Sequence, residues 1–301
     1  MTTTLRGLGT ALVTPFLPDG TVDVEALRKL VEWQVGEGAD FLVPCGSTGE
    51  AQTLTADERQ LVVRTVVEAA RGRLPVMAGA TSNDTREAVA EARRMAALGV
   101  TWILSATPYY NKPTPEGLVQ HFTAVADASP VPVCLYNVPG RTAVNMKPET
   151  VLRLAAHGNI LGIKESSGDL AQVQHLLLGR PEGFAVLSGE DWMTLAILAA
   201  GGDGLVSVAS NEIPNLLHHL VHAALRGEVA EAREILFGVL PLLEANFLET
   251  NPAPVKHALS VMGRLHDVLR LPLVPLSASR RAPLVAALRA AGVDLPQGAA
   301  S

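Results

Sequence analysis

Short runs of apolar residues alternate along this chain with longer segments in which apolar positions recur every three or four residues. A short apolar run is typical of a buried β-strand, and the longer period is typical of an amphipathic helix. Strands are predicted at residues 9–16, 40–46, 74–80, 101–108, 131–139, 160–167, 184–190 and 204–210. Helices are predicted between them, for example at residues 23–38 and 85–100.

Two of the predicted helices carry start signals. Thr55 and Glu58 have the spacing of a capping box, and Asn83-Asp84-Thr85 places capping residues before the next helix. Eight strands that are each followed by a helix indicate an α/β protein with a (β/α)8 TIM barrel. An open, doubly wound sheet is the alternative, although the chain has no Gly-x-Gly-x-x-Gly or phosphate-loop motif that would support nucleotide binding.

The strand pattern ends near residue 225. We therefore predict a catalytic barrel over residues 1–225 and a C-terminal helical region over residues 226–301. Helical spacing in that region covers residues 228–249, 252–263 and 279–292. These helices are too apolar to stand free in water, so we expect them to pack on the barrel or on another subunit.

Composition narrows the class of protein. Of the 301 residues, 48% are hydrophobic and 18% charged, as in a folded protein, and the formal net charge of −6 argues against a nucleic-acid or membrane-surface partner. The N-terminal residues lack the apolar segment of a signal peptide. The two cysteines, Cys45 and Cys134, lie in predicted strands and are expected to be reduced. We expect a cytoplasmic protein that acts on small molecules.

The eight histidines do not indicate a metal site. His218, His219 and His222 share one predicted helix, and we expect no carboxylate or cysteine ligand set near them. We expect these side chains to pack or to face solvent, and we expect no bound metal.

Lys164 is the most unusual residue of the chain. Five of the 24 Lys and Arg residues are lysines, and only Lys164 lies within an apolar strand run, Ile160-Leu161-Gly162-Ile163-Lys164. Burial of an ammonium group is unfavourable unless it is paired or loses its proton. One interpretation is a structural ion pair with Glu50 or Glu165. The other is a desolvated amine that acts as a nucleophile and forms a Schiff base with a carbonyl substrate.

Aromatic polar residues gather where predicted strands end, which is where a barrel of this kind carries its active site. All three tyrosines of the chain, Tyr109, Tyr110 and Tyr136, lie there. A phenol such as that of Tyr136 can relay protons while an imine forms.

Two further strand ends offer groups for carboxylates. Ser47 and Thr48, with the backbone of their Gly-Ser-Thr-Gly turn, suit a carboxylate, although this sequence is also that of an ordinary tight turn. Arg141 can bind a second carboxylate as a bidentate pair, although an isolated arginine is more often a surface residue. Glu190 and Asp191 end another strand, and we assign them no catalytic role.

Six motifs occur in order along the chain: "GSTGEA", "PYYNKPTPEGL", "YNVPGRT", "GIKESSGDL", "SGEDW" and "ETNPAPVKHAL". Together they resemble the dihydrodipicolinate synthase and N-acetylneuraminate lyase family of class I aldolases over essentially the whole chain. The resemblance implies a TIM barrel that activates pyruvate as a lysine imine, without a metal or organic cofactor. It also implies a homotetramer built as a dimer of dimers.

The resemblance implies catalytic roles for four residues. Lys164 matches the Schiff-base lysine, and Tyr136 matches the tyrosine that relays protons and stabilises the imine. Tyr110 matches the tyrosine that a neighbouring subunit inserts into the site, where it completes a hydroxyl relay with Ser47.

Substrate-binding positions follow in the same way. Thr48 and the backbone around it match the cradle for the pyruvate carboxylate, and Val206 matches a position whose backbone carbonyl faces the site. Gly189 is expected to contact substrate as well. Arg141 matches the residue that receives the carboxylate of aspartate semialdehyde.

Two substrates remain compatible with the resemblance. Ser47 stands where synthases of the family usually carry threonine and where the neuraminate lyases carry serine, so a sugar-acid aldolase of the N-acetylneuraminate or 2-keto-3-deoxygluconate type is the alternative. Arg141 favours L-aspartate 4-semialdehyde, because only that aldehyde needs a guanidinium for its own carboxylate. We therefore predict 4-hydroxy-tetrahydrodipicolinate formation in lysine biosynthesis through diaminopimelate. A barrel that binds a keto acid without imine chemistry is a third hypothesis.

Three residues, Asn83, Glu87 and Tyr109, match an allosteric lysine site found at the subunit interface of some family members. Ala56 and Arg59 stand where lysine-sensitive enzymes commonly carry histidines. We predict weak or absent inhibition by lysine.

Overall fold

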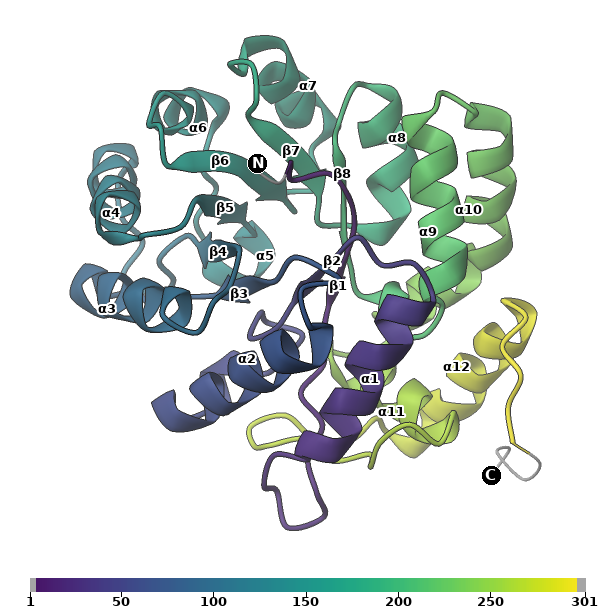
Figure 1. Ribbon diagram of the computed structural model, residues 1–301. Coiled ribbons are helices and arrows are strands. Elements are labelled where there is room, and N and C mark those ends of the chain that lie inside the picture. The colour runs from purple at the N-terminus through teal and green to yellow at the C-terminus, as the bar shows by residue number, and fades with distance from the viewer. Residues whose placement is uncertain (1–3, 297–301) are drawn as a thin grey trace.

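Eight parallel strands form a barrel at the centre of the computed structural model, which describes residues 4–296 (Figure 1). The strands are β1 (Gly7–Ala11), β2 (Phe41–Val43), β3 (Met77–Gly79), β4 (Trp102–Ala106), β5 (Val133–Asn137), β6 (Ile160–Glu165), β7 (Ala185–Ser188) and β8 (Gly204–Ser207). Their hydrogen-bonded order is β2-β1-β8-β7-β6-β5-β4-β3. Between β2 and β3 the barrel closes through one bridge pair, Leu42 and Val76. The prediction of a TIM barrel is confirmed.

All eight predicted strands are present, but each ends earlier than its apolar run does. The run at residues 40–46 illustrates the reason. Strand β2 stops at Val43, and Cys45 has a φ of 57°, a left-handed conformation that cannot continue a β-ladder. The chain therefore leaves the sheet just where its polar residues begin, and those residues lie in loops at the C-terminal end of the barrel.

Helices surround the barrel and cover its outer face (Figure 1). They are α1 (Val24–Gly36), α2 (Ala56–Ala70), α3 (Thr85–Ala96), α4 (Pro115–Ala128), α6 (Pro148–Ala155), α7 (Leu170–Gly179), α8 (Thr194–Ala199) and α9 (Pro214–Leu225). The single-turn helix α5 (Pro139–Thr142) lies inside this ring, directly after β5, and three short 3-10 turns are η1 (Ala51–Thr53), η2 (Asp191–Met193) and η3 (Ala209–Asn211). The predicted capping box is present: Thr55 Oγ1 accepts from the Glu58 N–H (3.2 Å), and Glu58 Oε2 accepts from the Thr55 N–H (2.9 Å).

The barrel interior is a packed core. Side chains that point inward from the strands, among them Phe41, Trp102 and Leu187, form one buried cluster that also contains Tyr136. The Phe41 and Trp102 rings meet edge to face with centroids 5.9 Å apart. The packed interior holds the strands in place. The candidate functional side chains lie above it, at the C-terminal ends of the strands.

Three further helices, α10 (Val229–Ala245), α11 (Ala253–Val261) and α12 (Ala278–Ala290), follow the barrel. Buried residues of α10 and α12 share a core with α9 and with Leu8 and Leu205 of the barrel strands. These helices therefore pack on the barrel, on one side of it (Figure 1). The division of the chain at residue 225 stays a prediction. Within residues 4–296, none of the helices has the length and apolar character needed to cross a membrane.

Candidate active site

Lys164 and Tyr136 lie side by side on adjacent strands. They are direct register partners of β6 and β5, and Lys164 Nζ is 4.3 Å from the centroid of the Tyr136 ring. Both side chains are buried, with 5% and 7% of their surface exposed. They stand at the C-terminal ends of their strands, the end at which barrels of this class carry out chemistry. An amine and a phenol so placed are within reach of one bound carbonyl compound.

The two acids considered as ion-pair partners of Lys164 are both engaged elsewhere. Glu50 pairs with Lys256 at 2.6 Å. Glu165 accepts a hydrogen bond from the Ser167 N–H (2.7 Å), and burial raises the pKa of this carboxyl. In the part of the chain that the structure describes, Lys164 has no ion-pair partner. The structural ion-pair interpretation is therefore wrong for both acids, and the interpretation as a nucleophile remains.

Gly189 leaves the space that the Lys164 side chain needs. A Cβ at residue 189 would lie 2.7 Å from Lys164 Cε and 1.9 Å from Ser166 Oγ, well inside van der Waals contact. The Gly189 N–H donates to the Glu165 carbonyl (2.8 Å), which holds the β7 end against β6. Gly189 thus lies beside Lys164, and its contact with substrate stays a prediction.

A cavity of about 400 Å³ opens at Tyr136, whereas Lys164, its register partner on β6, is not among the lining residues. Ser47, Tyr136 and Arg141 all line it, and so does Tyr109. The cavity is large enough for a small keto acid and an aldehyde of similar size. Predicted residues from the ends of three strands, β2, β4 and β5, are thus brought to one space.

Asn251 is a site residue that the sequence interpretation missed. Its Nδ2 donates to Thr48 Oγ1 (3.0 Å), its carbonyl accepts from Arg141 Nη2 (3.1 Å), and it lines the cavity. It therefore orients two predicted substrate-binding side chains at once. The only sequence signal was a polar Asn-Pro pair between two apolar helical segments, within a motif that was used for the resemblance alone.

Other predicted residues lie around the cavity rather than in its lining. Thr48 is buried behind Ser47, and Val206 is fully buried in β8 opposite Gly9 of β1. Tyr110 is 89% exposed and has a φ of 69°. A left-handed backbone at a bulky aromatic residue is rare. It directs a large apolar ring into solvent at the edge of the site.

The residues of the predicted lysine site are only partly brought together. Asn83 Nδ2 donates to the Tyr109 carbonyl (3.3 Å), and the Tyr109 hydroxyl donates to Gln52 Oε1 (3.4 Å). Glu87 on α3 is instead paired with Arg94 of the same helix. A lysine ligand would have to compete with that ion pair for Glu87.

Two acids follow Gly189. Burial raises the pKa of Glu190 to about 7, although the charges of Lys164 and Arg141 oppose this rise. Glu190 can therefore hold or release a proton near neutral pH, close enough to Lys164 to feel its charge. Asp191 is fully buried and accepts from the N–H groups of Val208 and Ala209 (3.1 Å each), so it anchors the loop after β8.

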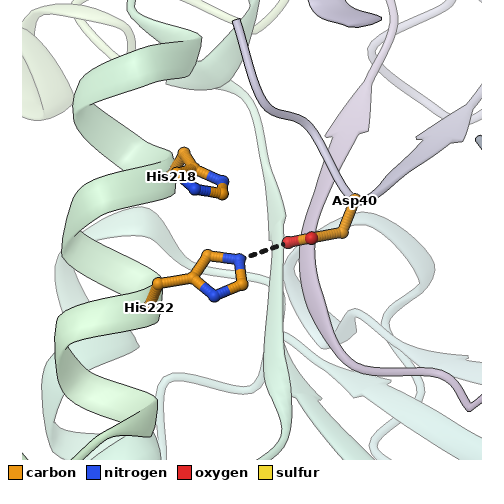
Figure 2. A group of neighbouring side chains, drawn as sticks. All are labelled: Asp40, His218 and His222. Atoms are coloured by element: carbon orange, nitrogen blue, oxygen red, sulfur yellow. Dashed lines mark hydrogen bonds and ion pairs between the residues drawn. The ribbon is translucent and has the colours of Figure 1, made fainter.

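The histidine group lies at the other end of the barrel, and the expectation that no carboxylate stands near it is wrong. Asp40, one residue before β2, accepts from His222 Nε2 (2.8 Å), and His218 lies one helical turn away from His222 on α9 (Figure 2). The contact could not be anticipated because 182 residues separate Asp40 and His222.

Comparison with known proteins agrees with this geometry. The sequence model of the Dihydrodipicolinate synthetase family matches residues 4–291. The 4-hydroxy-tetrahydrodipicolinate synthase of Koribacter versatilis (strain Ellin345) is 55% identical over 290 residues, which cover 96% of this chain and 97% of that protein. The chloride-inhibited dihydrodipicolinate synthase of Acinetobacter baumannii, solved with pyruvate, is 40% identical with a TM-score of 0.95 over 97% of this chain and 100% of that one.

A third similar protein has a bound amino acid in its solved structure. The synthase of Cyanidioschyzon merolae, solved with lysine bound, is 39% identical with a TM-score of 0.94 over 97% of this chain and 100% of that one. A match to the family along nearly the whole chain, together with a buried lysine and a tyrosine at the ends of β6 and β5, leads to one conclusion. The chain belongs to the Dihydrodipicolinate synthetase family.

Proposed function

We propose that this chain is a 4-hydroxy-tetrahydrodipicolinate synthase, which joins pyruvate to L-aspartate 4-semialdehyde in lysine biosynthesis through diaminopimelate. The observation that carries the proposal is Lys164, which is buried, has no ion-pair partner among residues 4–296 and lies 4.3 Å from the centroid of the Tyr136 ring. Tyr136 and Arg141 line the same cavity. The relatives with 46–55% identity that bear this name support the same reaction.

Pyruvate enters first. The Lys164 amine attacks the carbonyl carbon of pyruvate, and the resulting carbinolamine loses water to give an imine. The imine then loses a proton from the pyruvate methyl group and becomes an enamine. The hydroxyls of Tyr136 and Ser47 carry these protons, and the turn at Thr48 holds the pyruvate carboxylate. The protonated imine withdraws the electrons of the broken C–H bond, so side chains of the protein are sufficient for these steps.

The second substrate then adds. The enamine carbon attacks the aldehyde carbon of L-aspartate 4-semialdehyde and forms the new carbon–carbon bond. The amine of this substrate attacks the imine carbon, closes the ring and releases Lys164. One water is lost overall, at the carbinolamine step. Arg141, held by the Asn251 carbonyl, receives the carboxylate of the semialdehyde as a charge-assisted pair.

Arg141 also argues against the sugar-acid alternative. Its guanidinium lines the cavity, where a polyhydroxylated chain would need hydroxyl partners instead of a cation. Ser47 is compatible with either substrate, because serine and threonine both offer one hydroxyl.

We further propose that the active form is a homotetramer, a dimer of dimers, located in the cytoplasm. Tyr110 supports the oligomer, since an aromatic ring that is 89% exposed beside the site is a suitable group to complete the hydroxyl relay of a second subunit. Cys45 and Cys134 support the location, because both are free and buried. Weak or absent inhibition by lysine stays part of this proposal, and the pairing of Glu87 with Arg94 is consistent with it.

The test is a set of assays on the purified chain. Pyruvate and L-aspartate 4-semialdehyde are supplied with the next enzyme of the route, a reductase whose nicotinamide oxidation is followed. Parallel samples contain N-acetylneuraminate or 2-keto-3-deoxygluconate, and pyruvate release is measured. We expect turnover only in the first assay, with Lys164→Ala inactive and Arg141→Ala reduced about 10- to 150-fold in kcat/KM for the semialdehyde.

Borohydride reduction in the presence of pyruvate distinguishes imine formation on Lys164 from non-covalent binding of pyruvate. Wild type and Arg141→Ala should both gain the mass of a reduced pyruvate adduct on Lys164. Absence of the adduct in wild type would favour a barrel that only binds a keto acid. Pyruvate release from a sugar acid, without turnover of the semialdehyde, would favour the aldolase alternative.

A further inference from the structure

Asp40, His218 and His222 form a compact group (Figure 2). Asp40 directly precedes β2, so the group lies at the N-terminal end of the barrel, opposite the strand ends that carry Lys164 and Tyr136. One ligand atom of each lies within 4.8 Å of the others. The two histidines are four residues apart on α9, so both side chains project from the same face of the helix, and their ring centroids are 4.2 Å apart. Their rings face the Asp40 carboxylate across the gap between α9 and β2 (Figure 2).

Asp40 is held in place independently of the histidines. Its Oδ2 accepts from the Leu8 N–H (2.7 Å), and its own N–H donates to the Leu8 carbonyl (2.8 Å). Gly7 is required beside it, since a Cβ at that residue would lie 2.2 Å from Asp40 Oδ2. The carboxylate is therefore a fixed ligand on the barrel, and only side-chain torsions of the histidines are needed to adjust the group.

His218 has unused bonding capacity. Its Nδ1 is buried and has no hydrogen-bond partner among the described residues. His222 and Asp40 keep about a third of their side-chain surface exposed (32% and 30%), which leaves a path for an ion and for water ligands.

We propose that Asp40, His218 and His222 form a binding site for a divalent transition-metal ion of the zinc class. Two imidazoles and one carboxylate are a common ligand set for such ions, whereas Mg²⁺ and Ca²⁺ favour sites made of oxygen atoms. Water completes the coordination. The ion replaces the proton shared by His222 and Asp40 and joins α9 to the strand end before β2. Its role is structural, because the site stands at the end of the barrel opposite Lys164.

The experiment uses the full chain without an affinity tag, freed of metal with a chelator and dialysed. Zinc chloride is titrated by calorimetry, and thermal unfolding is recorded with and without zinc. His219→Gln is the matched control, because His219 is on the same helix but exposed and outside the group. His218→Gln removes a ligand that makes no ion pair, whereas His222→Gln also removes the pair with Asp40.

We expect one zinc ion per chain in wild type and in His219→Gln, with a zinc-dependent rise in melting temperature in both. His218→Gln and His222→Gln should each weaken zinc binding by at least about tenfold and abolish that rise. Synthase turnover of the metal-free variants should equal that of metal-free wild type. Failure of wild type to bind, equal affinity in His218→Gln, or equal loss in His219→Gln would each overturn the proposal.

Discussion

Lys256 Nζ lies 2.6 Å from Glu50 Oε1, and both side chains are fully buried although 206 residues separate them in the sequence. The pair connects α11 to the turn that follows β2 and carries Ser47 and Thr48. Lys256 also donates to the Thr14 carbonyl (2.9 Å), which satisfies a second of its protons. This arrangement occupies Glu50 and so leaves Lys164 without an acidic partner.

Removing one member of the pair should strongly destabilise the protein. In Lys256→Met the Glu50 carboxylate remains buried without its cation, and we expect a loss of about 3–5 kcal/mol in the free energy of unfolding. Urea unfolding measures it. The double variant Glu50→Gln/Lys256→Met should lose less than the sum of the two single variants, because the unpaired charge is gone. A single variant as stable as wild type would mean that the pair contributes nothing.

Tyr136→Phe removes the hydroxyl next to Lys164 and keeps the ring that packs in the barrel interior. We expect kcat to fall about 10²- to 10⁴-fold, since proton relay is lost while stability is nearly retained. Steady-state kinetics give kcat, and borohydride trapping should still detect the pyruvate adduct. Tyr109→Phe is the control: its hydroxyl also lies near the cavity, but it is bonded to Gln52 and should be dispensable. Equal effects of the two changes would argue against a relay through Tyr136.

Gly189→Ala places a methyl group where Lys164 Cε and Ser166 Oγ lie. We expect a loss of about 1–3 kcal/mol in stability and slower imine formation, because the nucleophile must leave its position. Stopped-flow trapping of the pyruvate adduct measures the rate. Gly238→Ala is the control, since a Cβ at that helical position meets nothing within 4 Å. Adduct formation at the wild-type rate in Gly189→Ala would show that the Lys164 side chain can adopt another reactive conformation that avoids the added methyl group.

Acid should destabilise the fold through His121. Burial lowers the pKa of this histidine to about 4, against an ordinary value of 6.5. Between pH 6.5 and 4 the unfolded chain therefore binds the extra proton, and stability falls as the pH falls, by about 3 kcal/mol across the window. Urea unfolding at several pH values measures this slope. It should become shallower in His121→Gln, and an unchanged slope would contradict the assignment. His175→Gln, at an exposed position, should keep the wild-type slope.

The site residues that could be predicted from sequence are those that stand out against their immediate neighbours in the chain. Lys164 is recognisable because a lysine interrupts an apolar strand, and Tyr136 because it ends another strand. The barrel itself follows from the repeated strand and helix pattern, which depends on short-range periodicity alone.

The remaining contacts connect distant parts of the chain, where no local pattern exists. Asn251 meets Thr48 across 203 residues, Lys256 meets Glu50 across 206, and His222 meets Asp40 across 182. Strand ends were also predicted too long, because an apolar run does not reveal where a left-handed residue such as Cys45 turns the backbone out of the sheet.

The closure of the barrel has a consequence for its motions. Strands β2 and β3 share one bridge pair, Leu42 and Val76, whereas β5 and β6 share five register pairs. Local opening therefore costs least along the β2–β3 boundary, and amide hydrogens there should exchange with solvent before those beside Lys164. Because the turn with Ser47 follows β2 directly, fluctuations of this boundary reach the hydroxyl side of the cavity, while the nucleophile stands on the most firmly paired part of the sheet.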